Sequence, residues 1–272
     1  MNTGLSAEQV GAYREDGYLA LADFLDGAEL GRWRAAVDEG VAQQLGNPQP
    51  ESSVFDNQGR DDDYARVFVQ CVNMWKVSVA MRELVLDARL GKLAADLAGM
   101  DGVRLYHDHA LIKEPWANPT TWHTDNPVDP FFSHRSIMLW IALDDATLQN
   151  GCLYVLPGSH RSSRFDTGGD TSSARIDALF DTYPEWRAID PVPVEVPAGG
   201  AVFLSGMVAH AAGPNMTRGR RRAFSILFMP DAAVFNGHKS ALPAVVASRL
   251  QPGDPIVDDE HLPLLYSRRY ER

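Results

Sequence analysis

Val103-Arg-Leu-Tyr-His-Asp-His-Ala-Leu-Ile-Lys113 is the stretch where the hydrophobic pattern of this chain changes to a period of two. Side chains of a β-strand alternate between its two faces, so this pattern predicts a strand. Several short apolar segments follow, separated by turn sequences rich in Gly, Pro and Asn, and such a series predicts a barrel or a double-sheet jelly roll. The further predicted strands are 136–143, 152–156, 192–196, 201–204 and 221–229.

The chain before this stretch has helical features instead. Ser6 and Asp26 are each followed three residues later by Gln or Glu, which is the spacing of a capping box. Apolar side chains recur at three- and four-residue steps in 30–41 and 86–97, as on core-facing helices. We therefore expect one domain over 1–272, with a mainly helical support (1–102), a jelly-roll core (103–231), an insertion within it (161–190) and a C-terminal extension (232–272).

Two polar segments interrupt these elements. The segment 47–64 is rich in Pro, Gln, Asn and Asp, which is typical of a loop. Its three aspartates at 61–63 are interpreted as a solvated turn, with a hard-cation site as the less favoured alternative. The insertion 161–190 is expected to contain one helix near 173–183.

The composition, with 45% apolar and 22% charged residues, is that of an ordinary soluble globular protein. Lys and Arg number 25 against 36 Asp and Glu, and a net charge of -11 disfavours nucleic acid and anionic membranes as partners. We therefore expect a small-molecule partner, whereas the oligomeric state stays open. Cys71 and Cys152 form no CxxC pair, and no apolar run suits a signal peptide or a membrane span. Free thiols in the cytoplasm are the expected setting.

Trp122-His-Thr-Asp125 places an imidazole and a carboxylate two residues apart, so both project to one side at a strand end. Alone, such a triplet also arises by chance in a surface turn. His210 ends the strand-like segment 201–209, and a jelly roll brings distant strand ends together at its mouth. Two imidazoles and one carboxylate on one face of a metal leave adjacent positions open, as in non-haem Fe(II) oxygenases. For His210 alone, the alternative is a buried, hydrogen-bonded histidine.

Arg221 and Ser225 lie on one face of the predicted strand 221–229. A buried guanidinium beside a hydroxyl is well matched to a carboxylate, such as the distal one of a dicarboxylate cosubstrate. Arg220 and Arg222 would then point outward as surface charges.

Three stretches in order agree with the motifs of one known family. They are Tyr106-His-Asp-His-Ala-Leu-Ile-Lys-Glu-Pro115 with Trp122-His-Thr-Asp125, then Ser136-Ile-Met-Leu-Trp-Ile-Ala-Leu-Asp-Asp-Ala146 with Asn150-Gly-Cys-Leu-Tyr-Val-Leu-Pro-Gly-Ser-His160, and last Ala198-Gly-Gly with His210-Ala-Ala-Gly-Pro-Asn215 and Arg221. On these stretches the chain resembles the phytanoyl-CoA dioxygenase family of Fe(II)- and 2-oxoglutarate-dependent oxygenases. The resemblance implies a jelly roll that uses Fe(II), 2-oxoglutarate and O2 to oxidise a small molecule, with release of succinate and CO2.

The resemblance also implies roles for individual residues. The family positions that match His123, Asp125 and His210 bind the iron. The position that matches Arg221 pairs with the distal carboxylate of 2-oxoglutarate, and the one that matches Trp140 lines the cosubstrate pocket.

Other matching positions leave the cosubstrate contacts open. Asn215 matches a motif position near the cosubstrate. Ala212 stands where the family often has a hydroxyl, so Ser225 is our candidate for the second contact to the distal carboxylate. His109 and Lys113 share one strand face and are further candidates, and the choice among these three stays open.

Four residues are candidates for substrate binding. Trp116, Trp122 and Phe131 flank the predicted ligand loop and suit an apolar or ring-bearing substrate, although loop packing explains them equally well. Arg175, in the insertion, is one of several arginines that suit a substrate carboxylate. Nothing singles out His107, His134, His238 or His261.

Hydroxylation in specialised metabolism is the favoured activity. The alternatives are desaturation, epimerisation or cyclisation by the same chemistry, a zinc hydrolase with the same ligands, and a catalytically silent jelly roll that binds a metal or ligand.

Overall fold

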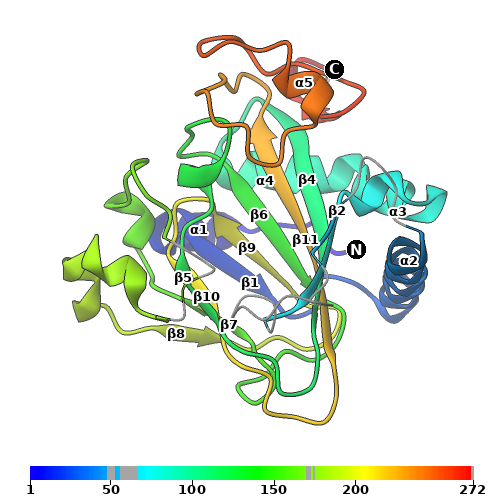
Figure 1. Ribbon diagram of the computed structural model, residues 1–272, viewed down its shortest axis with the longest axis vertical. Coiled ribbons are helices and arrows are strands. Elements are labelled where there is room, and N and C mark those ends of the chain that lie inside the picture. The colour runs from blue at the N-terminus through cyan, green and yellow to red at the C-terminus, as the bar shows by residue number, and fades with distance from the viewer. Residues whose placement is uncertain (48–52, 56–66, 170–172, 174, 271–272) are drawn as a thin grey trace.

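The core of the computed structural model, which describes residues 1–47, 53–55, 67–169, 173 and 175–270, is formed by two antiparallel sheets. The larger sheet has the order β1-β9-β6-β11-β4-β3-β2, with β12 also paired to β4, and the smaller sheet has the order β5-β10-β7-β8. Both contribute to one inner apolar cluster, so the sheets face each other as the layers of a jelly roll (Figure 1). The strands are β1 (Tyr18–Leu21), β2 (Ser53–Phe55), β3 (Val69–Val72), β4 (Gly102–Lys113), β5 (Thr120–His123), β6 (Ile137–Ala142), β7 (Leu153–Val155), β8 (Val192–Val194), β9 (Ala201–Ser205), β10 (His210–Ala212), β11 (Arg221–Pro230) and β12 (Leu264–Ser267).

The central strands of the larger sheet are buried on both faces, and the alternation of their side chains decides which residues face the smaller sheet. On β6, Leu139 packs outward among the helices, whereas Trp140 points inward. On β11, Phe224 packs outward with the same helical layer. The period of two therefore turns Arg221 and Ser225 inward, as the sequence predicts.

Helices cover the outer face of the larger sheet. They are α1 (Ala7–Asp16), α2 (Gly27–Gly46), α3 (Val79–Val85) and α4 (Ala88–Ala98), and α1 and α2 begin with the predicted capping boxes. The ring of Trp33 on α2 lies 5.3 Å from that of Phe224, and Leu90 and Leu93 of α4 join the same cluster. Figure 1 shows α2 and α3 together at one side of the sheet. Among the helices that the structure describes, none combines the length and apolar character needed to cross a bilayer.

The predicted strands correspond to β4, β6, β7, β8, β9 and β11, and Cys71 and Cys152 are buried free thiols. The prediction that His210 ends a strand is wrong. β9 ends at Ser205, a turn closed by a hydrogen bond from Val208 N to Ser205 O follows, and His210 begins β10. The N-terminal part also supplies three strands of the larger sheet, with β1 at one edge and β3 and β2 at the other.

The insertion lacks the predicted helix among its described residues. Two short 3-10 turns, η5 (Ala178–Asp181) and η6 (Pro184–Ala188), take its place. Pro184 begins η6 and disfavours helical backbone at the preceding Tyr183, so η5 and η6 do not join into one helix. Apart from β2, most of the predicted loop 47–64, including its aspartates 61–63, lies outside the described residues.

The segment after β11 folds back over one open end of the two sheets, where Figure 1 shows α5 (Ala244–Ala247) beyond the ends of β4 and β11. The buried guanidinium of Arg104 on β4 donates to Asp231 at 2.6 Å and to Asp259 at 2.7 Å. Between these anchors, the backbone N–H of Ala241 donates to the hydroxyl of Tyr106 at 3.2 Å. The extension is therefore held by β4 as it crosses the mouth of the fold.

Candidate metal centre and cavity

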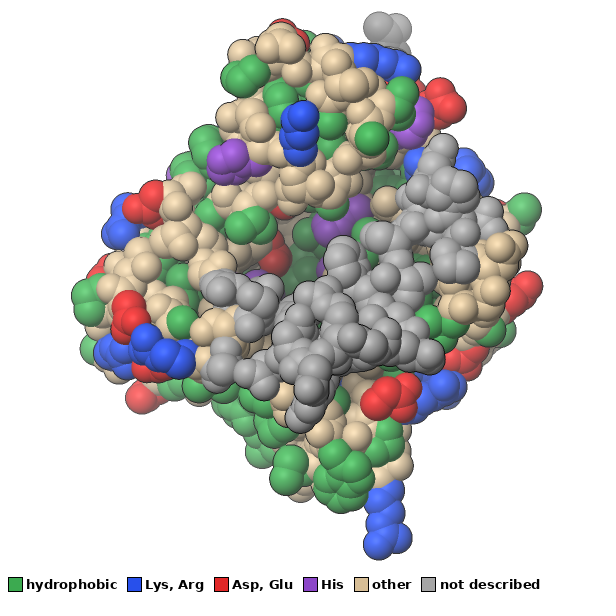
Figure 2. All heavy atoms as spheres, viewed as in Figure 1, with side chains coloured by type: hydrophobic (Ala, Val, Ile, Leu, Met, Phe, Trp, Pro, Cys, Tyr) green, Lys and Arg blue, Asp and Glu red, His purple; other side chains and the backbone are tan. Residues whose placement is uncertain are grey.

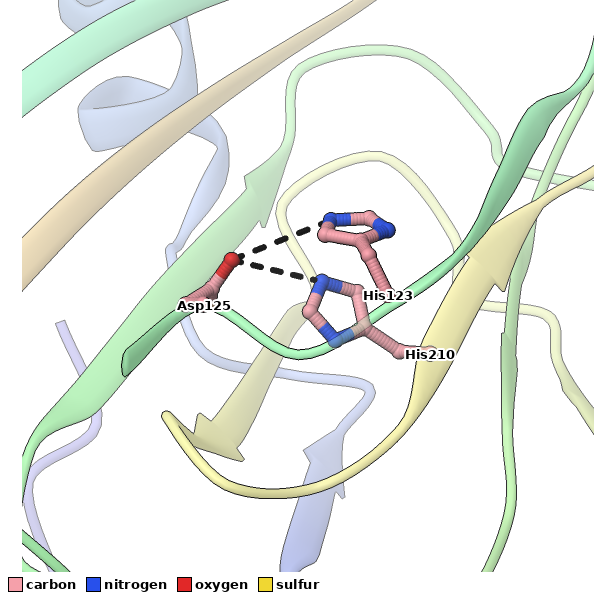
Figure 3. A group of neighbouring side chains, drawn as sticks. All are labelled: His123, Asp125 and His210. Atoms are coloured by element: carbon pink, nitrogen blue, oxygen red, sulfur yellow. Dashed lines mark ion pairs between the residues drawn. The ribbon is translucent and has the colours of Figure 1, made fainter. Parts of the chain in front are cut away.

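Two neighbouring strands of the smaller sheet place the predicted ligands together. β5 and β10 are antiparallel, and His123 is directly opposite His210 in their register. Asp125 follows β5 after one residue, and its carboxylate turns back toward both imidazoles (Figure 3). Asp125 Oδ1 lies 3.8 Å from His123 Nε2 and 3.9 Å from His210 Nε2.

The hydrogen bonds of both imidazoles prepare them to bind a metal. Nδ1 of His123 donates to the carbonyl of Thr121 at 2.8 Å, and Nδ1 of His210 donates to that of Val208 at 3.1 Å. With the proton on Nδ1, the lone pair of each Nε2 faces Asp125. Asp125 Oδ2 is buried without a hydrogen-bond partner in the described part of the chain.

The distances and the protonation of these groups also fit a metal ion. With bonds of about 2.1 Å, two ligand atoms of one ion lie about 3 Å apart at a right angle and at most about 4.2 Å apart, so a small inward movement brings all three groups onto one ion. Burial, followed by the neighbouring His210, lowers the pKa of His123 to about 4, so this imidazole is neutral near pH 7. The neutral form is the one that binds a metal. Among the described residues, these three side chains form the group whose potential ligand atoms all lie within 4.8 Å of one another.

Arg221 is a buried cation at the start of β11. Its side chain is inside the fold, with the guanidinium 5.3 Å from the ring of Trp140. Nε and Nη1 have no hydrogen-bond partner among the residues described, because the nearby Asp144 is bonded to Arg222 on the opposite face. Burial lowers the pKa of Arg221 to about 10. A charge buried in this way fits a carboxylate ligand, which would satisfy the free N–H groups.

One cavity of about 810 Å³ joins these groups. Its lining includes the three candidate ligands, Arg221 and Trp140, and most of the remaining wall is apolar. Figure 2 shows the hollow near the middle of this face, with histidine and acidic side chains visible inside it. A volume of this size suits a cosubstrate together with a small organic substrate.

His109 and Ser225 lie on neighbouring strands inside the fold. The two residues are paired in register, and Ser225 is also paired with Trp140. His109 lines the cavity, with Nδ1 2.7 Å from Gln70 Nε2 and with Nε2 lacking a partner among described residues. The Ser225 hydroxyl, too, is buried and unpaired within this part of the chain, although Ser225 is not in the cavity wall.

Lys113 and Asn215 lie behind the cavity wall. Lys113 Nζ donates to the carbonyl of Asn118 at 2.6 Å, and burial, with Arg221 as the second cause, lowers its pKa to about 6. The Asn215 amide donates to the carbonyls of Lys113, Glu114 and Gly219. Asn215 therefore ties the end of β4 to the turn that precedes Arg221, and neither residue lines the cavity.

The four predicted substrate residues do not line the cavity in the structure. Trp122 neighbours His123 on β5, so alternation points it away, toward Phe180. Phe131 is buried against Tyr106, and Trp116 is 62% exposed. Arg175 is exposed and is paired with Asp181 and Asp177. For Trp122, proximity to a ligand along the chain is a poor guide to the cavity wall, because neighbours on a strand face opposite sides.

Several residues of the cavity wall are not among the site residues predicted from the sequence. His107 and His261 line the cavity, as does the segment 240–245 of the C-terminal extension. The position of the extension depends on distant anchors such as Arg104, so no local pattern predicts it. His107 shares the inner face of β4 with His109, and the period of two would have found it.

Comparison with known proteins agrees with this geometry. The family model for phytanoyl-CoA dioxygenase (PhyH) matches residues 13–223 of the chain. A methylphosphonate hydroxylase from Gimesia maris is 26% identical over 230 residues, which cover 84% of this chain and 82% of the relative.

Solved structures extend the similarity to the whole fold. The α-ketoglutarate-dependent carbocyclase SnoK from nogalamycin biosynthesis has a TM-score of 0.79 at 29% identity, covering 96% of each chain. The epimerase SnoN, solved with Fe3+, α-ketoglutarate and nogalamycin RO, has a TM-score of 0.74 at 27% identity, covering 95% of this chain and 98% of its own. The chain belongs to the phytanoyl-CoA dioxygenase family of iron- and 2-oxoglutarate-dependent oxygenases.

Proposed function

We propose that this enzyme oxidises a C–H bond of an apolar, ring-bearing small molecule in specialised metabolism, and that hydroxylation is the usual outcome. One observation carries the proposal. His123, Asp125 and His210 converge in a cavity that also contains the buried guanidinium of Arg221. A metal site and a carboxylate site are therefore side by side in a mainly apolar pocket.

Each residue has a distinct task in this proposal. His123, Asp125 and His210 hold Fe(II), and Arg221 grips the distal carboxylate of 2-oxoglutarate, with the ring of Trp140 beside its guanidinium. When bound, the iron and cosubstrate activate O2 and supply the oxidant that removes a hydrogen atom from the substrate, with succinate and CO2 as co-products. The protein contributes placement, because the pocket decides which C–H bond faces the metal.

We assign the remaining cosubstrate contacts to the inner face of β4 and β11. The free Nε2 of His109 is a hydrogen-bond donor, because the amide of Gln70 donates to Nδ1. Ser225 is paired in register with His109 and Trp140 and, because it does not line the cavity, supports this contact from behind. Lys113 and Asn215 support this site from behind through their backbone carbonyl contacts.

The apolar wall supports an organic substrate with little charge. The relatives SnoK and SnoN belong to nogalamycin biosynthesis, which supports a ring-bearing substrate and a place in specialised metabolism. A net charge of -11 supports a small-molecule partner over nucleic acid or an anionic membrane, and a cytoplasmic location remains a prediction.

Ring closure or epimerisation is the second candidate outcome. The similarity to a carbocyclase and an epimerase supports it, and both outcomes can follow removal of the same hydrogen atom. Mass analysis of the product separates them. Hydroxylation adds one oxygen atom, ring closure by bond formation removes two hydrogen atoms, and epimerisation leaves the mass unchanged.

The experiment that tests the proposed function has two steps. Anaerobic Fe(II) and 2-oxoglutarate should give a weak visible charge-transfer band that His123→Ala abolishes, and O2 should then give substrate-dependent succinate release from a panel of ring-bearing molecules. A well-folded protein without the band would show that the assignment is wrong, and a band without succinate release would favour a catalytically silent fold.

A further inference from the structure

On β4, a β-bulge places Tyr106 beside His107, a residue of the cavity wall that has no role in the proposed function. In the register of β4 and β11, His107 is opposite Leu227 and Leu105 is opposite Phe228, so Tyr106 is an extra residue without a partner of its own. A bulge of this kind breaks the alternation of side chains. Tyr106 joins the inner apolar cluster, and His107 beside it lines the cavity. The bulge therefore turns two successive side chains to the inner side of the sheet.

The ring of His107 is held in place on two sides. It lies edge-on to Tyr106 at 4.5 Å between ring centroids, and edge-on to His109 at 5.3 Å. The Tyr106 hydroxyl accepts a hydrogen bond from the backbone of Ala241, which connects this arrangement to the C-terminal extension. A ring fixed in this way binds a partner at little cost in conformational entropy.

One nitrogen of this ring is buried and unused. His107 Nδ1 has no hydrogen-bond partner in the part of the chain that the structure describes. Burial, followed by the neighbouring His109, lowers the pKa of His107 to about 3, so the ring is neutral in the usual pH range. A neutral imidazole binds a hydroxyl or a carbonyl better than it binds a carboxylate.

The position of His107 along β4 separates it from the cosubstrate site. Lys113 is opposite Arg221 in the register, His109 is opposite Ser225, and His107 is one step further along the same face. Six residues of a strand span about 20 Å, which is more than an arginine side chain and a short keto-diacid cover together. His109 lies between Lys113 and His107 on β4, and it interacts electrostatically with Asp125. Along β4, His107 is thus further from Arg221 than His109 is.

We propose that His107 binds and orients the substrate, with its free ring nitrogen hydrogen-bonded to a hydroxyl or carbonyl group on an otherwise apolar ring system. This inference rests on the proposed function and adds the substrate class to it: a cyclic alcohol or ketone. The alternation of β4 points His107 into the cavity, Tyr106 at the bulge packs against its ring, and the apolar wall holds the rings of the substrate.

The test compares two probes that differ by one hydroxyl, 1-tetralol and tetralin. A hydroxyl donates and accepts, so it suits either tautomer of His107. Dissociation constants are measured by calorimetry on anaerobic protein loaded with Fe(II) and 2-oxoglutarate. The ratio of the constant for tetralin to that for 1-tetralol isolates the contribution of the hydroxyl, because the rings are the same.

We expect His107→Leu to reduce this ratio about five-fold, which corresponds to one ordinary hydrogen bond, and His107→Gln to retain most of it. His238→Leu makes the same change at an exposed histidine outside the cavity wall and should leave the ratio unchanged. An equal ratio in wild type and His107→Leu overturns the proposal, as does wild type that does not bind 1-tetralol.

The visible band with Fe(II) and 2-oxoglutarate separates this inference from the proposed function. If wild type lacks the band, the proposed function fails, whereas a normal band with an unchanged probe ratio refutes only the role of His107. A second measurement needs no folded leucine variant. In Zn(II)- and 2-oxoglutarate-loaded protein, the 15N resonance of His107 Nδ1 should shift with 1-tetralol and not with tetralin, and an unchanged resonance contradicts the inference.

Discussion

Replacement of Arg221 by methionine should change ligand affinity and protein stability in opposite directions. Arg221 is 2% exposed, and its Nε and Nη1 have no partner among the described residues. Since burial lowers the pKa of this cation to about 10, well below its ordinary value, its charge destabilises the unliganded fold near pH 7, by about 3 kcal/mol. Methionine removes that cost and retains much of the apolar stem.

The two effects have calculable sizes. Without ligand, we expect Arg221→Met to raise the free energy of unfolding by about 1 to 3 kcal/mol, because a buried charge without a counterion is replaced by an apolar group. With ligand, loss of a buried pair with carboxylate should weaken binding of 2-oxoglutarate by about 3 kcal/mol, or roughly 100-fold.

The free energy of unfolding is measured by urea unfolding of the metal-free protein. The affinity for 2-oxoglutarate is measured by anaerobic titration of the visible band. Arg222→Met is the matched control on the same strand, because its side chain is paired with Asp144 and Asp38 on the outer face. The control should lose a little stability and keep its affinity for 2-oxoglutarate. If Arg221→Met lowers stability and leaves the affinity unchanged, Arg221 is a structural residue and the reasoning is refuted.

Three further predictions concern residues away from the metal. Burial raises the pKa of Asp108 from 3.8 to about 7, so between these pH values the native state keeps a proton that the unfolded state loses. The free energy of unfolding should therefore fall as pH rises through this range, by at most about 1.4 kcal/mol per pH unit. Asp108→Asn should remove this contribution from the pH dependence of urea unfolding, and a variant as steep as wild type contradicts it. Asn215→Ala loses hydrogen bonds to three carbonyls, so it should lower the free energy of unfolding by about 2 to 3 kcal/mol and weaken 2-oxoglutarate binding. An unchanged affinity for 2-oxoglutarate would show that Asn215 does not support the Arg221 site. Arg175→Ala breaks only exposed ion pairs and should leave succinate release within two-fold of wild type, whereas a large loss would restore Arg175 as a substrate residue.

The period of two was enough to predict β4, β6, β7, β8, β9 and β11, and to assign the faces of β11. On β11 it places Arg221 and Ser225 inward and Arg222 outward, as the structure has them. It works here because the central strands are packed on both faces, so every side chain has a definite side. The spacing of His123 and Asp125 is also local, and it could be interpreted directly.

Features that depend on tertiary structure could not be predicted from the sequence. His210 begins β10 rather than ending β9, because a turn after Ser205 lies inside an apolar segment without a clear break in the pattern. Trp122 was assigned to the substrate although it neighbours His123 on a strand and must face away from it. The bulge that places Tyr106 beside His107 follows from pairing with β11, and no residue in β4 marks it by type.

Anomalous diffraction at the iron edge tests the central claim most directly, with crystals grown anaerobically in Fe(II) and 2-oxoglutarate. We expect one iron peak bonded to His123 Nε2, Asp125 Oδ1 and His210 Nε2, with the distal carboxylate of 2-oxoglutarate on Arg221. A peak elsewhere, or a cosubstrate that does not reach Arg221, contradicts the account.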